Sequence, residues 1–173
     1  MKSKIALLHS NNLLESKRLA KQVCSNMQIN VYCVEDRAYQ LINEEGALKD
    51  FIIQELGEKA YKNGFFDTSL TNSFDFNNSA FLNKLQEIMY DYIVKEIESL
   101  DKLTLIISNQ IIETGILHLS NNLIICEFKN SEETEESINL ESLKTVASHY
   151  IQTDNFKNMS ISLTGCLVYC FNH

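Results

Sequence analysis

Arginine is scarce in this chain of 173 residues, which contains only Arg18 and Arg37. Arginine is well suited to holding phosphate groups, because its planar fork donates two parallel hydrogen bonds. Any phosphate chemistry must therefore depend mainly on lysines and backbone amides. Glycine, which lets a backbone approach a phosphate closely, is also sparse: the chain has five, and the first is Gly46.

Long apolar runs are missing as well. No stretch approaches the roughly 18 residues that a membrane span needs. The N-terminal MKSKIALLHS lacks the longer apolar stretch and the cleavage site of a signal peptide. Five cysteines, an odd number without a disulfide spacing, predict a reducing, cytoplasmic setting. The net charge of −8 argues against nucleic acid and anionic membranes as main partners.

Short apolar strands alternate with helices, which predicts an α/β fold: a three-layer parallel sheet with helices on both faces. The length and the 45% of hydrophobic residues suit one domain over 1–173. A helical insertion over about 46–99 separates the second and third strands. The predicted strands are 4–9, 29–34, 102–108 and 122–128, with one or two more in SISLTGCLVYCF near the C-terminus.

Helical periodicity fills the segments between the strands. The KNG segment at 62–64 is expected to end one of these helices, because glycine is a common stop signal. In the longest helix, the predicted buried face carries Phe81, Leu85, Ile88 and Tyr92. The predicted helices begin at Glu15, at Asp36 and after Gly46, run from Ala80 to about Ser99, and extend from SEETEES (131–137) to Tyr150.

GALKDFIIQELGEKAYKNGFFDTSL (46–70) has LGE near the end of a predicted helix, followed by a glycine, an aspartate and a leucine at regular spacing. This segment resembles one of dephospho-coenzyme A kinases, in which LGE is followed by dG-x-x-D-R-x-x-L. FNNSAFLNKLQEI (76–88) and QIIETGI (110–116) resemble two further family motifs, so the likeness covers roughly 4–130. The resemblance implies the P-loop kinase fold and transfer of the γ-phosphate of ATP to dephospho-coenzyme A.

The family's phosphate-binding loop aligns with NNLLESKR, which begins at Asn11. Lys17 stands at the loop lysine, but Asn11 and Ser16 replace both glycines, and Arg18 replaces the hydroxyl that binds magnesium. Side chains in place of glycine oppose the left-handed angles and close approach that a phosphate cradle requires. Asn11, Ser16 and Lys17 are thus a degenerate nucleotide site, and the competing interpretation is a helix start capped by Asn11 or Asn12.

Two carboxylates are the catalytic candidates if the protein is an active kinase. The family has D-x-D after the second strand, and VED keeps only Asp36, as either a base or a helix cap. Glu113 matches a family glutamate and either shapes an acceptor pocket or is an exposed loop residue. Arg37 either grips an anion or is exposed. The family's lid supplies arginines to the transferring phosphate, whereas 131–137 is acidic and has none.

No metal site is predicted. Cys166, Cys170 and His173 form C-x3-C-x2-H, but zinc needs four ligands, so the thiols are expected to be buried in the core. His9 ends the first strand, where it either touches a ligand at the carboxyl edge of the sheet or is a satisfied strand end.

These departures favour a dephospho-coenzyme A kinase-like protein that is not an active kinase. It would act by binding another protein or a coenzyme A-like ligand, without a cofactor. One alternative is a divergent active kinase that uses ATP and Mg²⁺ with Lys17, Asp36 and Glu113. Another alternative is an unrelated α/β interaction protein of a multiprotein assembly.

Overall fold

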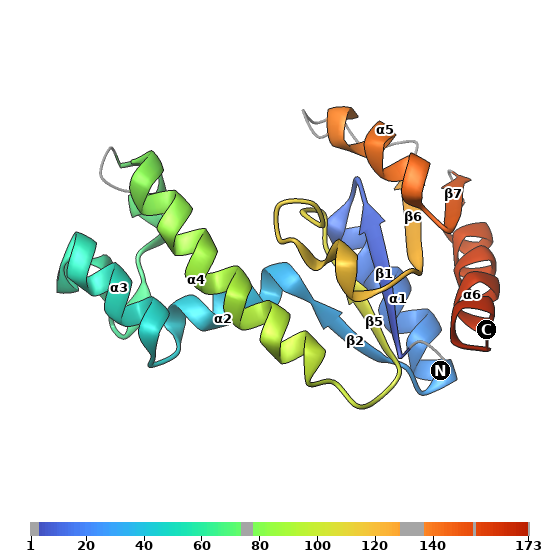
Figure 1. Ribbon diagram of the computed structural model, residues 1–173, viewed down its shortest axis with the longest axis horizontal. Helices are drawn as coiled ribbons and strands as arrows, with labels where there is room; N and C mark the ends of the chain where they lie inside the picture. The colour runs from blue at the N-terminus through green and yellow to red at the C-terminus, as the bar shows by residue number, and fades with distance from the viewer. Residues whose placement is uncertain (1–3, 74–77, 129–136, 154, 173) are drawn as a thin grey trace. The chain divides into compact units, whose positions relative to one another are not determined.

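Figure 1 shows the computed structural model of the chain, which describes residues 4–73, 78–128, 137–153 and 155–172. The chain divides into two compact units. The first unit comprises Met1–Val34 and Glu98–His173, and the second comprises Glu35–Ile97. The single domain expected from the sequence stays a prediction.

A five-stranded sheet forms the centre of the first unit. Its strand order is β2-β5-β1-β6-β7, and each pairing is parallel. Strand β1 is therefore central, and Leu7 lies opposite Ile106 on one side and Leu123 on the other. The strands are β1 (Ile5–Ser10), β2 (Asn30–Cys33), β5 (Thr104–Ile107), β6 (Leu123–Phe128) and β7 (His149–Thr153).

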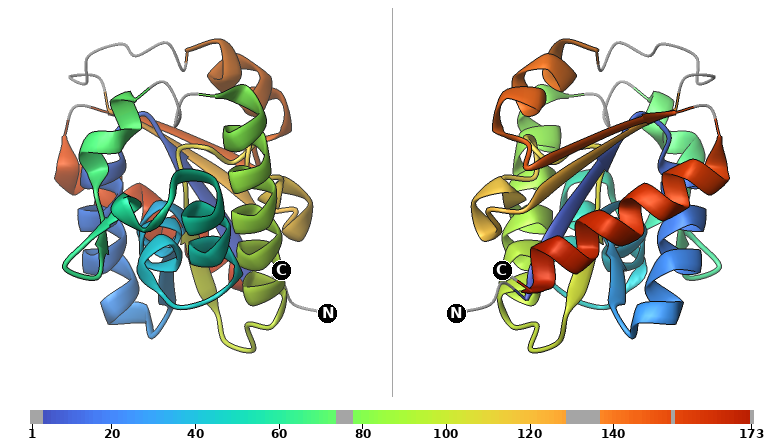
Figure 2. Two further views of the ribbon diagram at one scale, coloured as in Figure 1. Left: turned by 90° about the vertical axis from the view of Figure 1, so that its left-hand side faces the viewer. Right: turned by 90° about the vertical axis from the view of Figure 1, so that its right-hand side faces the viewer.

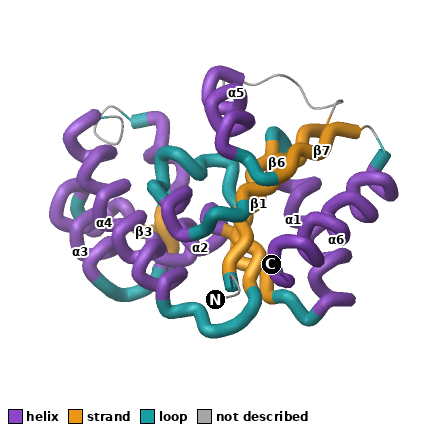
Figure 3. The backbone as a smooth tube through the Cα atoms, turned by 45° about the vertical axis from the view of Figure 1, so that its right-hand side comes forward, coloured by secondary structure: helices purple, strands orange, loops and turns teal. Residues whose placement is uncertain are grey.

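Helices cover the sheet on both faces. On one face, Ala6, Leu8 and their neighbours pack against α1 (Leu13–Met27) and α6 (Phe156–Asn172), which lie side by side in Figure 3. On the other face, α5 (Ser137–Val146) packs against β6. Burial from both sides explains why the central strands are continuously apolar. The predicted α/β architecture is confirmed.

The second unit lies in the sequence between β2 and β5. It contains the helices that were predicted there. Phe51 and Phe81 stack with ring centroids 5.5 Å apart, and the Tyr61 hydroxyl donates a 2.7 Å hydrogen bond to the Ile42 carbonyl. The elements are α2 (Val34–Asn43), α3 (Ala47–Leu56), β3 (Tyr61–Lys62), β4 (Phe65–Phe66) and α4 (Ser79–Glu98), with 3₁₀ turns at Glu58–Ala60 and Thr68–Asn72.

The prediction that KNG ends a helix is wrong. Helix α3 already ends at Leu56, and Gly57 follows it with a φ of 79°. Asn63 and Gly64 instead form the turn between β3 and β4, with φ values of 53° and 84°. Two successive left-handed residues match the twist of a hairpin, and Asn-Gly is the strongest short signal for that turn.

The strands predicted near the C-terminus are also wrong, because SISLTGCLVYCF lies within α6. Met159, Leu163 and Leu167 recur at the helical spacing of four and have no exposed surface. The fifth strand is β7, which begins at His149, so the helix predicted to reach Tyr150 ends at Val146. The β-branched residues of α6 suggested a strand. The segment is a helix because its apolar residues, spaced four apart, pack into the core.

The buried face of α4 differs in its second half from the prediction. Phe81 and Leu85 are buried as expected, but Ile93 and Ile97 complete the face in place of Ile88 and Tyr92. Tyr92 is 54% exposed, and its ring lies 5.9 Å from the Arg37 guanidinium.

Among the helices of the described ranges, none combines the length and the apolar character needed to cross a membrane.

Candidate functional site

The turn between β1 and α1 is where the sequence places the degenerate nucleotide site. Only Asn11 and Asn12 separate the two elements. Asn12 has extended backbone angles, and its side-chain oxygen accepts a 3.1 Å hydrogen bond from the Glu15 amide. The buried Ser16 donates from both its amide and its hydroxyl to the Asn12 carbonyl, at 3.0 and 2.8 Å. Asn12 is therefore the N-cap of α1, as one of the two interpretations of this segment predicts.

Three backbone amides of this turn donate hydrogen bonds within the protein. The Asn12 amide donates to Ser10 Oγ at 3.0 Å, while the Glu15 and Ser16 amides are bound to Asn12. No residue of the described segment 10–18 has a left-handed φ. A phosphate cradle needs successive amides that point to one centre, which alternating right- and left-handed residues produce. This turn has the geometry of a capped helix start.

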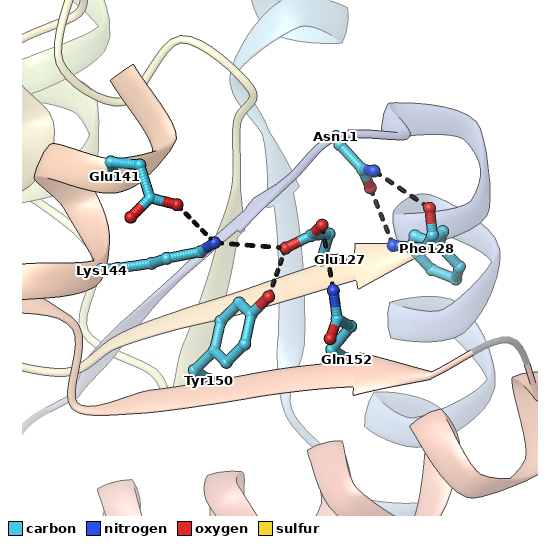
Figure 4. A network of polar contacts seen from close by, with 7 residues as sticks. All are labelled: Asn11, Glu127, Phe128, Glu141, Lys144, Tyr150 and Gln152. Atoms are coloured by element: carbon cyan, nitrogen blue, oxygen red, sulfur yellow. Dashed lines mark hydrogen bonds and ion pairs between the residues drawn. The ribbon is translucent and has the colours of Figure 1, made fainter. Parts of the chain in front are cut away.

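Asn11, at the position of the first loop glycine, joins β1 to β6. Its side-chain nitrogen donates to the Phe128 carbonyl at 3.1 Å, and its side-chain oxygen accepts from the Phe128 amide at 2.9 Å (Figure 4). The side-chain amide thus continues the ladder of the two strands by one further peptide-like unit. Glycine, without a side chain, offers neither bond.

The residues that follow in α1 also have structural surroundings. Arg18 lies 3.5 Å from Glu15 and 4.5 Å from the centre of the Phe156 ring on α6. A guanidinium at this position is a poor substitute for the hydroxyl that binds magnesium in a P-loop, because it has no lone pair to offer a cation. Lys17 is half-buried on the same helix.

Asp36 and Arg37 lie at the start of α2, in the second unit. Asp36 is exposed. Arg37 is held by two carboxylates, with contacts of 2.7 Å to Glu44 and 2.8 Å to Glu96. The hydrogen bonds that Arg37 donates to Glu44 and to Glu96 raise the pKa of Arg37 above its ordinary value. Because two carboxylates already bind its guanidinium, Arg37 is poorly placed to bind an anionic ligand.

Glu113 lies in the first unit, in the turn that follows β5, and is exposed. The neighbouring Thr114 is buried, and its hydroxyl donates to the Gln110 carbonyl at 2.8 Å. The candidate catalytic carboxylates Asp36 and Glu113 therefore belong to different units, and their shared role stays a prediction. Most of the acidic segment 131–137 lies outside the described residues.

A polar network at the carboxyl end of β6 was not found by sequence reasoning. Glu127 accepts hydrogen bonds from the Tyr150 hydroxyl and, at 3.2 Å, from the Gln152 side chain (Figure 4). Lys144 of α5 lies 3.6 Å from Glu127 and 2.8 Å from Glu141. A signal was present: HYIQT contains tyrosine, isoleucine and threonine, which are enriched in strands.

In this network one lysine, Lys144, offsets part of the charge of two carboxylates. The Tyr150 hydrogen bond, and then the charge of Lys144, lower the pKa of Glu127, although partial burial acts in the opposite direction. Lys144 in turn is shared between two carboxylates. Ligands of open α/β sheets bind at the carboxyl ends of the strands. In this protein the Lys144–Glu127 ion pair lies at that edge, next to the Asn11–Phe128 hydrogen bonds.

Comparison with solved structures decides the fold. The chain aligns with the dephospho-CoA kinase from Campylobacter jejuni at a TM-score of 0.70, over 95% of this chain and 96% of that one. The fold is that of a dephospho-CoA kinase. The Thermus thermophilus protein TT1252 aligns at a TM-score of 0.64 over 98% of both chains. Sequence identities are only 14% and 12%. No protein-family model and no curated protein matches the sequence.

The phosphates of ATP and a magnesium ion do not fit the β1–α1 turn of this dephospho-CoA kinase fold. The amides of Asn12, Glu15 and Ser16 are bound to Ser10 and Asn12, and the side chain of Arg18 offers a metal ion no lone pair. The C-terminal thiols belong to the core as expected: Cys170 is buried, which raises its pKa to about 11, and Cys166 is partly buried. Among the described residues, no group of three acidic, histidine or cysteine side chains can hold a metal ion.

We expect Glu127→Gln to weaken the dependence of stability on acid. A carboxylate whose pKa is lowered by folding stabilises the folded state above its ordinary value of 4.5, and this contribution is lost as the pH falls through the lowered pKa. Glutamine cannot titrate, so urea unfolding of the variant should change less between pH 7 and pH 3 than that of the parent chain.

The matched control is Glu98→Gln, which replaces an exposed carboxylate and should retain the parent's acid dependence. Tyr150→Phe should give an intermediate result, and should cost about 1 kcal/mol at neutral pH through the lost hydrogen bond. Identical acid dependence in the parent and in Glu127→Gln would contradict the role assigned to this network.

Proposed function

We propose that this chain is a dephospho-CoA kinase-like pseudoenzyme, which does not transfer phosphate and acts by binding another protein or a coenzyme A-like ligand. It works in the reducing environment of the cytoplasm, where its five cysteines are compatible with the free state. The observation that carries the proposal is the capped helix start at Asn12, in place of an open phosphate loop.

The hydrogen bonds of the turn oppose the binding of a triphosphate. To expose the amides of Asn12, Glu15 and Ser16, the protein must break three hydrogen bonds, each of which contributes about 1 kcal/mol. A total of about 3 kcal/mol corresponds to a more than hundredfold loss of affinity. Glu15 adds a carboxylate in the first turn of α1, which repels a phosphate group at the same helix end.

Thermal unfolding with and without Mg-ATP tests the proposal. A ligand present at a hundred times its dissociation constant stabilises a protein by about 2.7 kcal/mol, which shifts the midpoint by several degrees. We expect no shift with Mg-ATP up to millimolar concentration, and no phosphate transfer to dephospho-coenzyme A. An active dephospho-CoA kinase measured in parallel shows that both assays respond.

Lys17→Met provides the matched variant, because Lys17 is the retained loop lysine. Under the proposal this substitution changes neither assay. A magnesium-dependent shift with ATP that Lys17→Met abolishes would overturn the proposal and favour the divergent active kinase, with Asp36 and Glu113 as its candidate catalytic residues. A shift with coenzyme A alone supports a ligand-binding role, whereas no shift with either ligand directs the search to protein partners.

A further inference from the structure

We propose that β7 and the outer face of α6 bind a second copy of this chain, so that the sheet continues across a symmetric dimer. The first observation is the position of β7. Among the described strands β7 pairs with β6 alone, and therefore forms one edge of the five-stranded sheet. In the right-hand view of Figure 2, β7 and α6 face the viewer, and no other described element of the first unit lies in front of them.

The β7 edge lacks the features with which monomeric proteins protect an exposed strand. Such edges usually carry proline, lysine or other charged residues that prevent pairing with another chain. The strand reads HYIQT, without proline or a formally charged residue. Every second residue of this edge strand therefore directs its backbone N–H and C=O outward, where a further strand can pair with them.

The outer face of α6 is uncharged beyond Lys157 and carries three exposed large hydrophobic side chains beside small polar ones. Ile161, Val168 and Tyr169 are 62%, 47% and 53% exposed. The helix has no charged residue after Lys157. A surface helix normally places charged residues on its solvent side. Since Ile151 of β7 packs against α6 in the core, the exposed face and the strand edge lie close together on one side of the unit.

Charge indicates which partner fits this surface. Residues 149–173 contain one acid, Asp154, and one base, Lys157, so residues 1–148 carry the whole net charge of −8. Two copies of an acidic chain repel one another through most of their surface. The neutral β7–α6 surface is where they can meet without placing like charges together.

The strand also favours a copy of itself on geometric grounds. Two identical edge strands can pair antiparallel about a two-fold axis, which is the commonest symmetry of homodimers. Because each α6 packs beneath its own β7, the two helices then lie on the same face of the joined sheet and cover each other's apolar residues. One strand and one helix face form a small interface by the standards of stable dimers, so we expect micromolar affinity.

Sedimentation equilibrium of the full chain over about 1 to 100 µM, the range expected for so small an interface, tests this inference. The expected mass rises from 19.9 kDa to twice that value as concentration increases. Hydrogen exchange at the same concentrations should show slower exchange of the β7 amides in the dimer. A chain that remains monomeric throughout, or a dimer in which β7 gains no protection, would overturn the inference.

The double variant Ile161→Lys/Val168→Lys places charge on the proposed interface and should weaken association at least tenfold. Both residues are exposed, so circular dichroism of the dilute variant should match that of the parent. Leu14→Lys, which alters an apolar residue that is 74% exposed on α1, should leave association unchanged. Equal effects of the two sets of substitutions would reject this surface. The inference does not depend on whether the chain binds ATP.

Discussion

Replacement of Asn11 by alanine should lower the free energy of unfolding by about 2 kcal/mol. The substitution removes the two hydrogen bonds that the side chain makes with the Phe128 backbone, at 2.9 and 3.1 Å. The amide and the carbonyl of Phe128 then lose their partners in a partly buried place, and each such loss typically costs about 1 kcal/mol or more. Chemical denaturation at neutral pH measures the change.

The family glycine at this position makes the prediction informative. Asn11→Gly should destabilise the chain at least as much as Asn11→Ala, and the double variant Asn11→Gly/Ser16→Gly should not acquire ATP binding. Restored glycines leave the Asn12 cap in place, since its contacts involve the Glu15 amide and the Asn12 carbonyl. Recovery of Mg-ATP binding by this double variant would show that the absence of these two glycines alone prevents ATP binding.

Asn26→Ala is the matched control for these variants. Asn26 lies on the exposed side of α1, and its side chain makes one 3.2 Å hydrogen bond to the Gln22 carbonyl. An exposed substitution of this kind usually changes stability by no more than about 0.5 kcal/mol. If Asn11→Ala falls in the same range, the Phe128 contact does not stabilise the edge of the sheet.

Leu163→Ala should destabilise the chain by about 2 to 5 kcal/mol, the range for large-to-small changes in a packed core. Leu163 has no exposed surface and belongs to the main hydrophobic cluster, which also contains residues of the sheet and of α1. Ile161→Ala, two residues earlier, should change stability by about 0.5 kcal/mol or less, because Ile161 is exposed.

Comparison of Leu163→Ala with Ile161→Ala tests whether this segment is a helix or the strand that the sequence suggested. Residues two apart lie on the same face of a strand but on different faces of a helix. Similar costs for both substitutions would therefore contradict the helical assignment of α6. Unfolding at two protein concentrations separates a contribution of Ile161 to the proposed dimer from its contribution to the fold.

Periodicity made the central architecture predictable. The strands β1, β2, β5 and β6 and the helices α1 and α4 were expected near their observed positions, because their apolar residues recur at the spacing that burial requires. The likeness to dephospho-coenzyme A kinases, which the structural comparison bears out for the fold, also came from segments of the sequence. A helix cap at Asn11 or Asn12 followed from the chemistry of a short polar side chain before a helix, and the structure places it at Asn12.

Other features depended on contacts between distant residues. Asn11 reaches Phe128 across 117 positions, and Tyr150 reaches Glu127 only because β7 pairs with β6 in a particular register. The assignment of the C-terminal segment also required the sheet, since its valine and isoleucine suit a strand while its buried leucines suit a helix.

The sequence by itself determined the class of fold and the absence of glycine between the first strand and the first helix, because both follow from local residue types and their spacing. Only the tertiary structure decided what forms the turn and its surroundings: a capped helix, an asparagine that extends the sheet, and a carboxylate paired with a lysine at the strand ends. The physical reason is that a hydrogen bond between residues far apart in the chain exists only after the packing of the core has brought them within about 3 Å.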